Sequence, residues 1–278
     1  MRTIGKSVTA AAMAVALLVA GAIAFGPTAD QPAGDLGSSV SNRSSSALLA
    51  PVVSAASLDG TIASLQDRLR AAPDDWRSSA SLGLAYVAQA RVTGDPSWYP
   101  KAEGVLARSL RVNADDNVEG LLGLGMLDLA RHDFSAALRN GRRAAALDPH
   151  GAEAYGVIGD ALLELGRYDR AFRAFQTMVD TRPDLSSYAR VAYARELVGD
   201  VRGAERAMQM AFDAAGTPAD AAWTAYQLGE LAFGSGDVRS ARGWYARGRD
   251  LDPSYVPNLA GLAKVAWARG DDVLAVER

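Results

Sequence analysis

The chain has 278 residues, of which 49% are hydrophobic and 22% are charged, a composition typical of soluble globular proteins. A formal net charge of −3 is too near zero to attract nucleic acid as a bulk electrostatic partner. The absence of Cys excludes disulfide bonds, thiol nucleophiles and Cys-ligated zinc.

The segment 1–25 has the pattern of an export signal. Arg2 and Lys6 precede an apolar stretch at 8–25, and small residues at 20–24 match what a signal peptidase recognises. An uncleaved membrane anchor is the alternative, because about 18 apolar residues can just span a bilayer. In either case we expect the rest of the chain to be extracytoplasmic, either secreted or anchored at the outer face of the cytoplasmic membrane.

A linker is predicted at 26–57. The segment is rich in Ser, Ala, Gly and Pro and shows no helical period. Such a composition buries too little apolar area to offset the entropy of backbone ordering, so we expect the linker to be disordered.

The stretch 58–278 is built from a repeat. One copy reads Tyr155-x2-Ile158-Gly159-x2-Leu162, then Gly166-x-Tyr168-x2-Ala171-x3-Phe175, then Pro183. The small residues Gly159 and Ala171 would let two helices approach closely. Gly166 would permit the turn between them, and Pro183 would end the second helix.

Further copies recur at a spacing of about 34 residues. Their first helices contain Leu82-Gly83, Leu124-Gly125, Val191-Ala192 and Leu228-Gly229. The pattern resembles the tetratricopeptide repeat family, in its bacterial exported or membrane-anchored form. The resemblance implies an all-α, right-handed solenoid of stacked antiparallel helix pairs. We expect an N-terminal cap helix, five repeats and an incomplete sixth.

The sixth repeat begins near Leu259, and the sequence stops at Arg278 before its second helix is complete. Solenoids normally finish with a polar cap, and none is visible in the pattern. Three interpretations stay open: the chain is a fragment of a longer protein, it self-associates through this uncapped end, or the end frays.

Catalytic patterns are missing from the sequence. His132 and His150 fall in predicted loops, and no HExxH, GxSxG or P-loop pattern occurs. The run Asp115-Asp116-Asn117 fits the start of a helix, where Asp and Asn are favoured caps, better than it fits a cation site. We therefore expect no enzyme activity, no cofactor and no metal.

The family resemblance implies that the first helix of each pair lines a concave groove that binds a partner. The Lys and Asn positions with which some members hold a terminal carboxylate are not matched, so an acidic C-terminal tail is not the expected ligand. Acidic and aromatic residues at these positions instead favour a segment with basic and apolar side chains. The predicted groove residues are Met126, Asp160, Glu164, Arg190, Tyr193, Glu196, Trp223, Tyr226, Glu230, Phe233 and Trp267.

The second helices carry many arginines, which form either a solvated outer face or a basic surface for anionic polymers or lipid headgroups. These arginines are Arg139, Arg142, Arg143, Arg170, Arg173, Arg202, Arg206, Arg239 and Arg242. The function predicted from the sequence is a non-catalytic protein-protein interaction scaffold outside the cytoplasm, with no nucleic acid partner. The alternative is an accessory module of a larger envelope enzyme or assembly whose active part lies beyond residue 278. Contact with a membrane is expected only through the N-terminal segment, if it is not cleaved.

Overall fold

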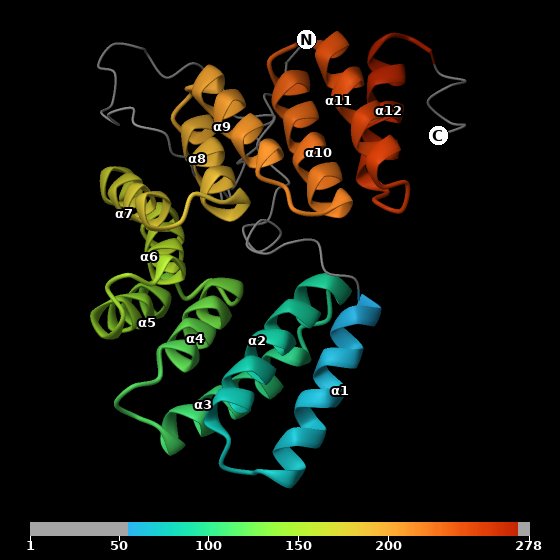
Figure 1. Ribbon diagram of the computed structural model, residues 1–278. Coiled ribbons are helices and arrows are strands. Elements are labelled where there is room, and N and C mark those ends of the chain that lie inside the picture. Colours follow the sequence, from blue (N-terminus) through green and yellow to red (C-terminus); the bar gives the residue numbers. More distant parts are fainter. Residues whose placement is uncertain (1–54, 272–278) are drawn as a thin grey trace, which may run out of the picture.

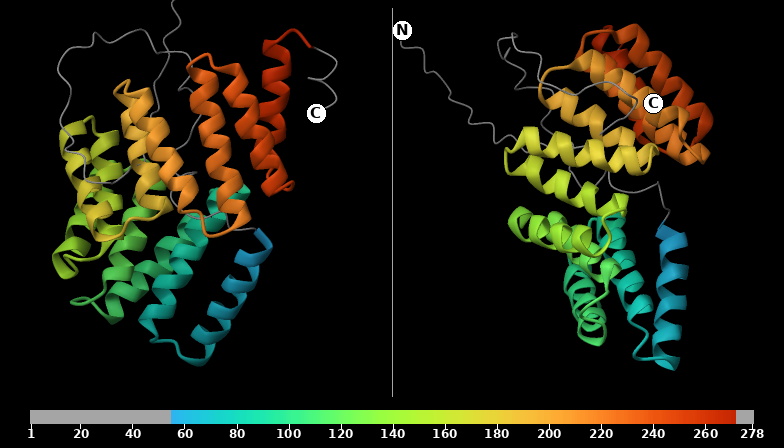
Figure 2. Two further views of the ribbon diagram at one scale, coloured as in Figure 1. Left: turned by 45° about the horizontal axis from the view of Figure 1, so that its top comes forward. Right: turned by 60° about the vertical axis from the view of Figure 1, so that its left-hand side comes forward.

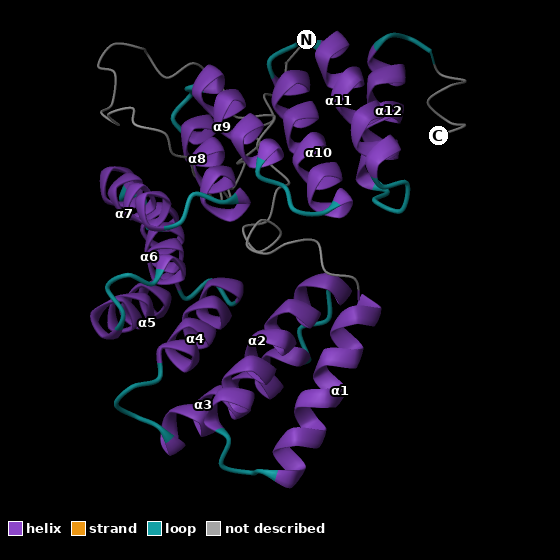
Figure 3. Cartoon of the chain, in the orientation of Figure 1, coloured by secondary structure: helices purple, strands orange, loops and turns teal. Residues whose placement is uncertain are grey.

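The computed structural model describes residues 55–271, which form twelve helices and no strand (Figure 3). The predicted export signal, most of the predicted linker and residues 272–278 lie outside the described residues. The helices are α1 (Ala55–Ala71), α2 (Trp76–Thr93), α3 (Trp98–Val112), α4 (Val118–Ala130), α5 (Phe134–Leu147), α6 (Ala152–Glu164), α7 (Tyr168–Thr181), α8 (Leu185–Leu197), α9 (Val201–Asp213), α10 (Pro218–Gly234), α11 (Val238–Leu251) and α12 (Pro257–Ala268). The predicted all-α fold class is confirmed.

Consecutive helices from α2 onward pack as antiparallel pairs that stack along a curved path (Figures 1 and 2). The pairs are α2 with α3, α4 with α5, α6 with α7, α8 with α9 and α10 with α11. Helix α1 packs on α2 at one end, and α12 packs on α10 and α11 at the other. The described part of the chain is therefore a solenoid of stacked helix pairs.

The even-numbered helices line the inside of the curve. Neighbours in this row contact each other, α2 with α4, α4 with α6, α6 with α8 and α10 with α12. Within residues 55–271, the odd-numbered helices make no comparable contact with one another. Because the more closely spaced row lies on the inside of a curve, α2, α4, α6, α8, α10 and α12 form the inner face. The outer face is formed by α3, α5, α7, α9 and α11.

Side-chain caps mark where many of the helices begin. Asn117 accepts a hydrogen bond from the Gly120 backbone N–H at 2.8 Å, and Asp133 caps α5 through the Ala136 N–H in the same way. The helix-start interpretation of residues 115–117 is thereby confirmed for Asn117. Such caps satisfy backbone donors that have no partner within the helix.

Three of the pairs, α2/α3, α6/α7 and α10/α11, are held together at a point where a glycine faces a bulky side chain. Gly159 of α6 lies against the ring of Phe175 of α7, and Gly229 of α10 lies against the ring of Tyr245 of α11. Both rings are fully buried. Since a Cβ atom at either glycine would collide with its ring, the helices can approach this closely only because the side chain is missing.

The turns that follow the inner helices use the left-handed backbone region. Gly166, Gly199, Gly236 and Gly270 have φ between 70° and 84°, where glycine carries no steric cost. His132 takes the equivalent place after α4 with φ of 61°. The side chains of His132 and of His150 are both exposed, as the loop prediction requires.

We expect Gly159→Ala to destabilise the protein by about 1–3 kcal/mol, because the added methyl group overpacks the contact with Phe175. The matched control is Gly243→Ala on α11, where nothing lies within 4 Å of the added Cβ. Since alanine favours helix more than glycine does, the control should gain about 0.5–1 kcal/mol. Urea unfolding followed by circular dichroism measures both changes. Equal effects at the two sites would contradict the close-approach argument.

Candidate partner-binding surface

The eleven predicted groove residues do not share one environment. All lie on even-numbered helices, but Asp160, Arg190, Tyr193 and Trp223 are buried. Their side chains are therefore not available to a partner in this structure, in contrast to the expectation of an open groove. The other seven are partly or fully exposed, and contact with a partner stays a prediction for them: Met126, Glu164, Glu196, Tyr226, Glu230, Phe233 and Trp267.

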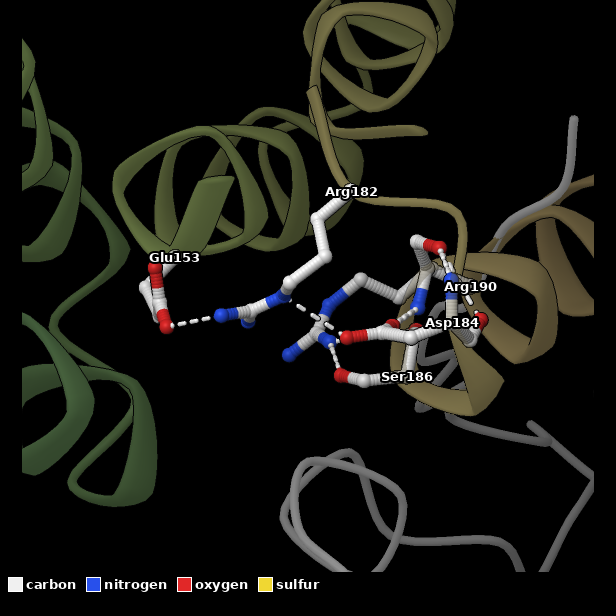
Figure 4. Close-up of polar contacts among 6 residues, drawn as sticks. Glu153, Arg182, Asp184, Ser186 and Arg190 are labelled. Carbon is white, nitrogen blue, oxygen red and sulfur yellow. Dashed lines mark hydrogen bonds and ion pairs between the residues drawn. The ribbon is translucent and has the colours of Figure 1, made fainter. Parts of the chain in front are cut away.

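The cause of this burial in the middle of the solenoid is an ion pair between two repeats. The Nε of Arg190 on α8 donates to both carboxylate oxygens of Asp160 on α6 at 3.1 Å, and its Nη2 donates to Oδ2 at 3.0 Å. The Nη1 of Arg190 donates to the hydroxyl of Ser186, one turn earlier on α8 (Figure 4). A fork of this kind satisfies both charges and ties α6 to α8.

A second, more exposed ion pair crosses the same joint. Arg182, in the link between α7 and α8, donates from Nη1 to Glu153 of α6 at 2.6 Å and from Nε to Asp184 at 2.8 Å (Figure 4). Asp184 also caps α8 through the Ser187 N–H. Arg182 therefore connects the start of α6 to the start of α8 at the surface, beside the buried pair.

Burial dominates the electrostatics of Asp160. Removal from water raises the pKa of its carboxyl group from 3.8 to about 6, against the opposing attraction and hydrogen bonds of Arg190. The folded state thus binds a proton at Asp160 more readily than the unfolded state does between these two pH values.

A second polar cluster lies at the C-terminal end of the inner face. The Tyr245 hydroxyl donates to Oε1 of Glu230 at 2.5 Å, and Lys264 of α12 pairs with the same oxygen. The ammonium of Lys264 also lies over the Phe233 ring, 4.4 Å from its centroid. This cation–π contact and the ion pair hold α10, α11 and α12 in fixed relation.

Tyrosine rings extend this cluster. The ring centroid of Tyr226 lies 5.8 Å from that of Tyr245 and 6.1 Å from that of Tyr255, in the link before α12. Burial raises the pKa of the Tyr255 hydroxyl above its ordinary value, and Tyr226 and Glu230 add to the shift. Tyr255 was not predicted, because it lies in a loop outside the repeat pattern.

These contacts change what the inner face offers to a partner. Two of its acids, Asp160 and Glu230, are already paired with Arg190 and Lys264. The most exposed side chain among the predicted groove residues is Trp267, at 69%. Trp267 of α12 and Phe233 of α10 occupy the same position of the repeat, four residues after Ala263 and Gly229 respectively. The surface is therefore suited to packing against rings more than to attracting positive charge.

No cluster of three or more potential metal ligands occurs between residues 55 and 271. In the same range no helix is both long enough and apolar enough to cross a bilayer.

Comparison with known proteins identifies the repeat. Residues 128–196 match the model of the tetratricopeptide repeat family. This segment of the chain is similar to tetratricopeptide repeats. A sequence comparison with curated proteins returned no match.

Solved structures of tetratricopeptide repeat proteins share the fold. A thermophilic example from Thermus thermophilus is 21% identical, with a TM-score of 0.58 over 68% of this chain and 99% of its own. PilF of Pseudomonas aeruginosa is 15% identical, with a TM-score of 0.55 over 73% of this chain and 87% of its own. The structure of the APC/C hetero-tetramer Cut9–Hcn1 matches at 16% identity and a TM-score of 0.60, over 80% of this chain and 43% of the other. At these identities the similarity shows the fold alone.

We expect the stability contributed by Asp160 to depend on pH. A group whose pKa is raised on folding contributes its stability below pH 3.8, and that contribution is lost as the pH rises through about 6. From about pH 4 to about pH 7.5, the wild-type protein should lose about 2 kcal/mol of unfolding free energy relative to Asp160→Asn. Urea unfolding of both proteins at the two pH values measures this change.

The control for this prediction is Glu153→Gln, which breaks the more exposed pair with Arg182. Its unfolding free energy should stay within about 1 kcal/mol of the wild-type value at both pH values. A wild-type protein that gains stability relative to Asp160→Asn as the pH rises would show that the attraction of Arg190 outweighs burial.

Proposed function

We propose that this protein is a non-catalytic scaffold that binds a peptide or protein segment on the inner face of its solenoid. The observation that carries the proposal is the set of accessible rings on the last helices of the inner row, Tyr226, Phe233 and Trp267. Aromatic side chains supply much of the binding energy at protein interfaces, because they bury a large area at little cost in conformational entropy.

The rings are also held in place before a partner arrives. Phe233 is covered on one side by the ammonium of Lys264, and Tyr226 packs against Tyr245 and Tyr255. Preorganised side chains lose less freedom on binding, which favours affinity. Proteins of this fold assemble with other proteins, as in the Cut9–Hcn1 hetero-tetramer.

The partner we propose presents apolar side chains to the rings and, secondarily, basic ones. Basic groups can interact with the faces of Trp and Tyr rings, although the paired state of Glu230 and Asp160 limits direct charge pairing. We place this binding outside the cytoplasm, on the basis of the positive and then apolar pattern of residues 1–25.

Site-specific photo-crosslinking in the native host tests the proposal. A benzophenone amino acid at position 267 should capture a discrete protein partner, and the same amino acid at the exposed position 63 on α1 should not. Trp267→Ala should then weaken binding of the captured partner at least about 10-fold in calorimetry, because it removes the most exposed ring. Capture from both positions, or an affinity unchanged by Trp267→Ala, would contradict binding at the inner face.

A further inference from the structure

Helices α5, α7 and α9 lie next to one another along the chain of outer helices (Figure 1), and each carries exposed arginines. Arg139, Arg173 and Arg206 occupy one repeat position, each two residues after an alanine that is fully buried. A residue two positions from a buried one lies about 200° around the helix, so these three side chains point away from the core. We call them the arginine row.

Four more exposed arginines flank the arginine row. Arg142 and Arg143 follow on α5, which contains no acidic residue. Arg170 precedes the row on α7, and Arg202 precedes it on α9. The net charge of the whole chain is −3, so the positive charge on this surface does not follow from the average composition. Basic residues are gathered on this part of the outer face.

None of these seven arginines forms an ion pair or a side-chain hydrogen bond within residues 55–271. Arginines on the neighbouring helix α8 and in the link before it do form such pairs: Arg182, Arg190 and Arg195 each bind a carboxylate. The seven guanidinium groups on α5, α7 and α9 are therefore not occupied by a carboxylate of the described part of the chain.

The placement of charge also works against the helices that carry it. Arg202 lies in the first turn of α9, which holds no acidic residue, and Asp213 is the last residue of this helix. In α7 the first turn holds both Arg170 and Asp169, and Asp180 lies in the last turn. The helix dipole favours the opposite arrangement, with acids near the N-terminus and bases near the C-terminus. Interaction with the helix dipole thus does not explain Arg170 or Arg202.

We propose that the arginine row is a docking surface for an extended acidic segment of another protein. The guanidinium group binds a carboxylate through two parallel hydrogen bonds, and three such groups in successive repeats match acidic side chains spaced along an extended chain. An extended segment can follow the curve of the outer face across α5, α7 and α9.

A polypeptide fits this surface better than an anionic bilayer does. Asp180 and Asp213 lie seven residues after Arg173 and Arg206, about 10 Å along the same helix faces. A flat anionic surface would meet this second, acidic row as well as the arginine row. A narrow chain lying along the arginines avoids it.

Binding of fluorescein-labelled poly-L-glutamate to residues 26–278 at low salt tests the proposal. The variant Arg139→Glu/Arg173→Glu/Arg206→Glu should bind at least 10-fold more weakly than wild type. The control variant Arg68→Glu/Arg111→Glu/Arg269→Glu makes the same change in net charge at exposed arginines on other helices, and it should bind within 2-fold of wild type. Equal losses in the two variants would overturn the proposal, because bulk charge would then explain the binding.

Two further measurements separate the alternatives. The polypeptide proposal would be overturned in favour of a membrane surface if vesicles of anionic phosphatidylglycerol captured the protein and poly-L-glutamate did not bind it.

Independently, Arg170→Gln and Arg202→Gln should each raise the midpoint of urea unfolding, because they remove a positive charge from a helix N-terminus. A lowered midpoint would show that these arginines stabilise their helices, and the argument from the helix dipole would fail. The Trp267→Ala variant should bind poly-L-glutamate normally, so failure of the outer-face proposal and failure of the inner-face proposal are distinguishable.

Discussion

The close contact between a glycine on one helix and a bulky, buried side chain on another is the constraint on which the stacking of this solenoid depends. Tyr245 shows how far its effect extends: the ring lies against Gly229 of its own pair and also against Gly261 of α12. Leu106 does the same between Gly83 of α2 and Gly123 of α4. One buried side chain thereby sets both the spacing within a pair and the spacing to the next repeat, because interiors packed to crystal-like density tolerate little adjustment.

The joint between α6 and α8 is held by a charged pair instead. Gly123 of α4 and Gly261 of α12, which face Leu106 and Tyr245, correspond in the repeat to Arg190 of α8. A long charged side chain at this position leaves no room for a bulky side chain of the preceding repeat, and it extends to Asp160 on α6. A buried ion pair contributes less net stability than its hydrogen bonds suggest, because both charges are desolvated, but it is directional. The pair therefore sets the orientation of the two halves of the solenoid more than it adds to their stability.

The repeat fold was predictable from the sequence because its determinants are local. The glycine before the second helix, the buried alanine within it and the bulky residue that follows recur at fixed spacings, and each acts on its nearest neighbours. The accessibility of the groove residues was not predictable in the same way. Asp160 is exposed or buried according to what stands thirty residues later in the next repeat, and the pattern of a single repeat does not contain that information. Tyr255 was missed for a related reason, since its contacts with Tyr226 depend on how the link before α12 folds.

The two faces of the solenoid differ in whether their charged side chains are paired. On the inner face, Asp160 and Glu230 are neutralised by Arg190 and Lys264 from the following repeat, so that charge there holds repeats together. On the outer face, the odd-numbered helices lie further apart, and the seven exposed arginines of α5, α7 and α9 have no such pairing within the described residues. The curvature of the double row produces this difference, because it brings inner side chains within reach of the next repeat and separates the outer ones. A curved solenoid thus has one face where charge stabilises its own architecture and one face where charge is free to act on other molecules.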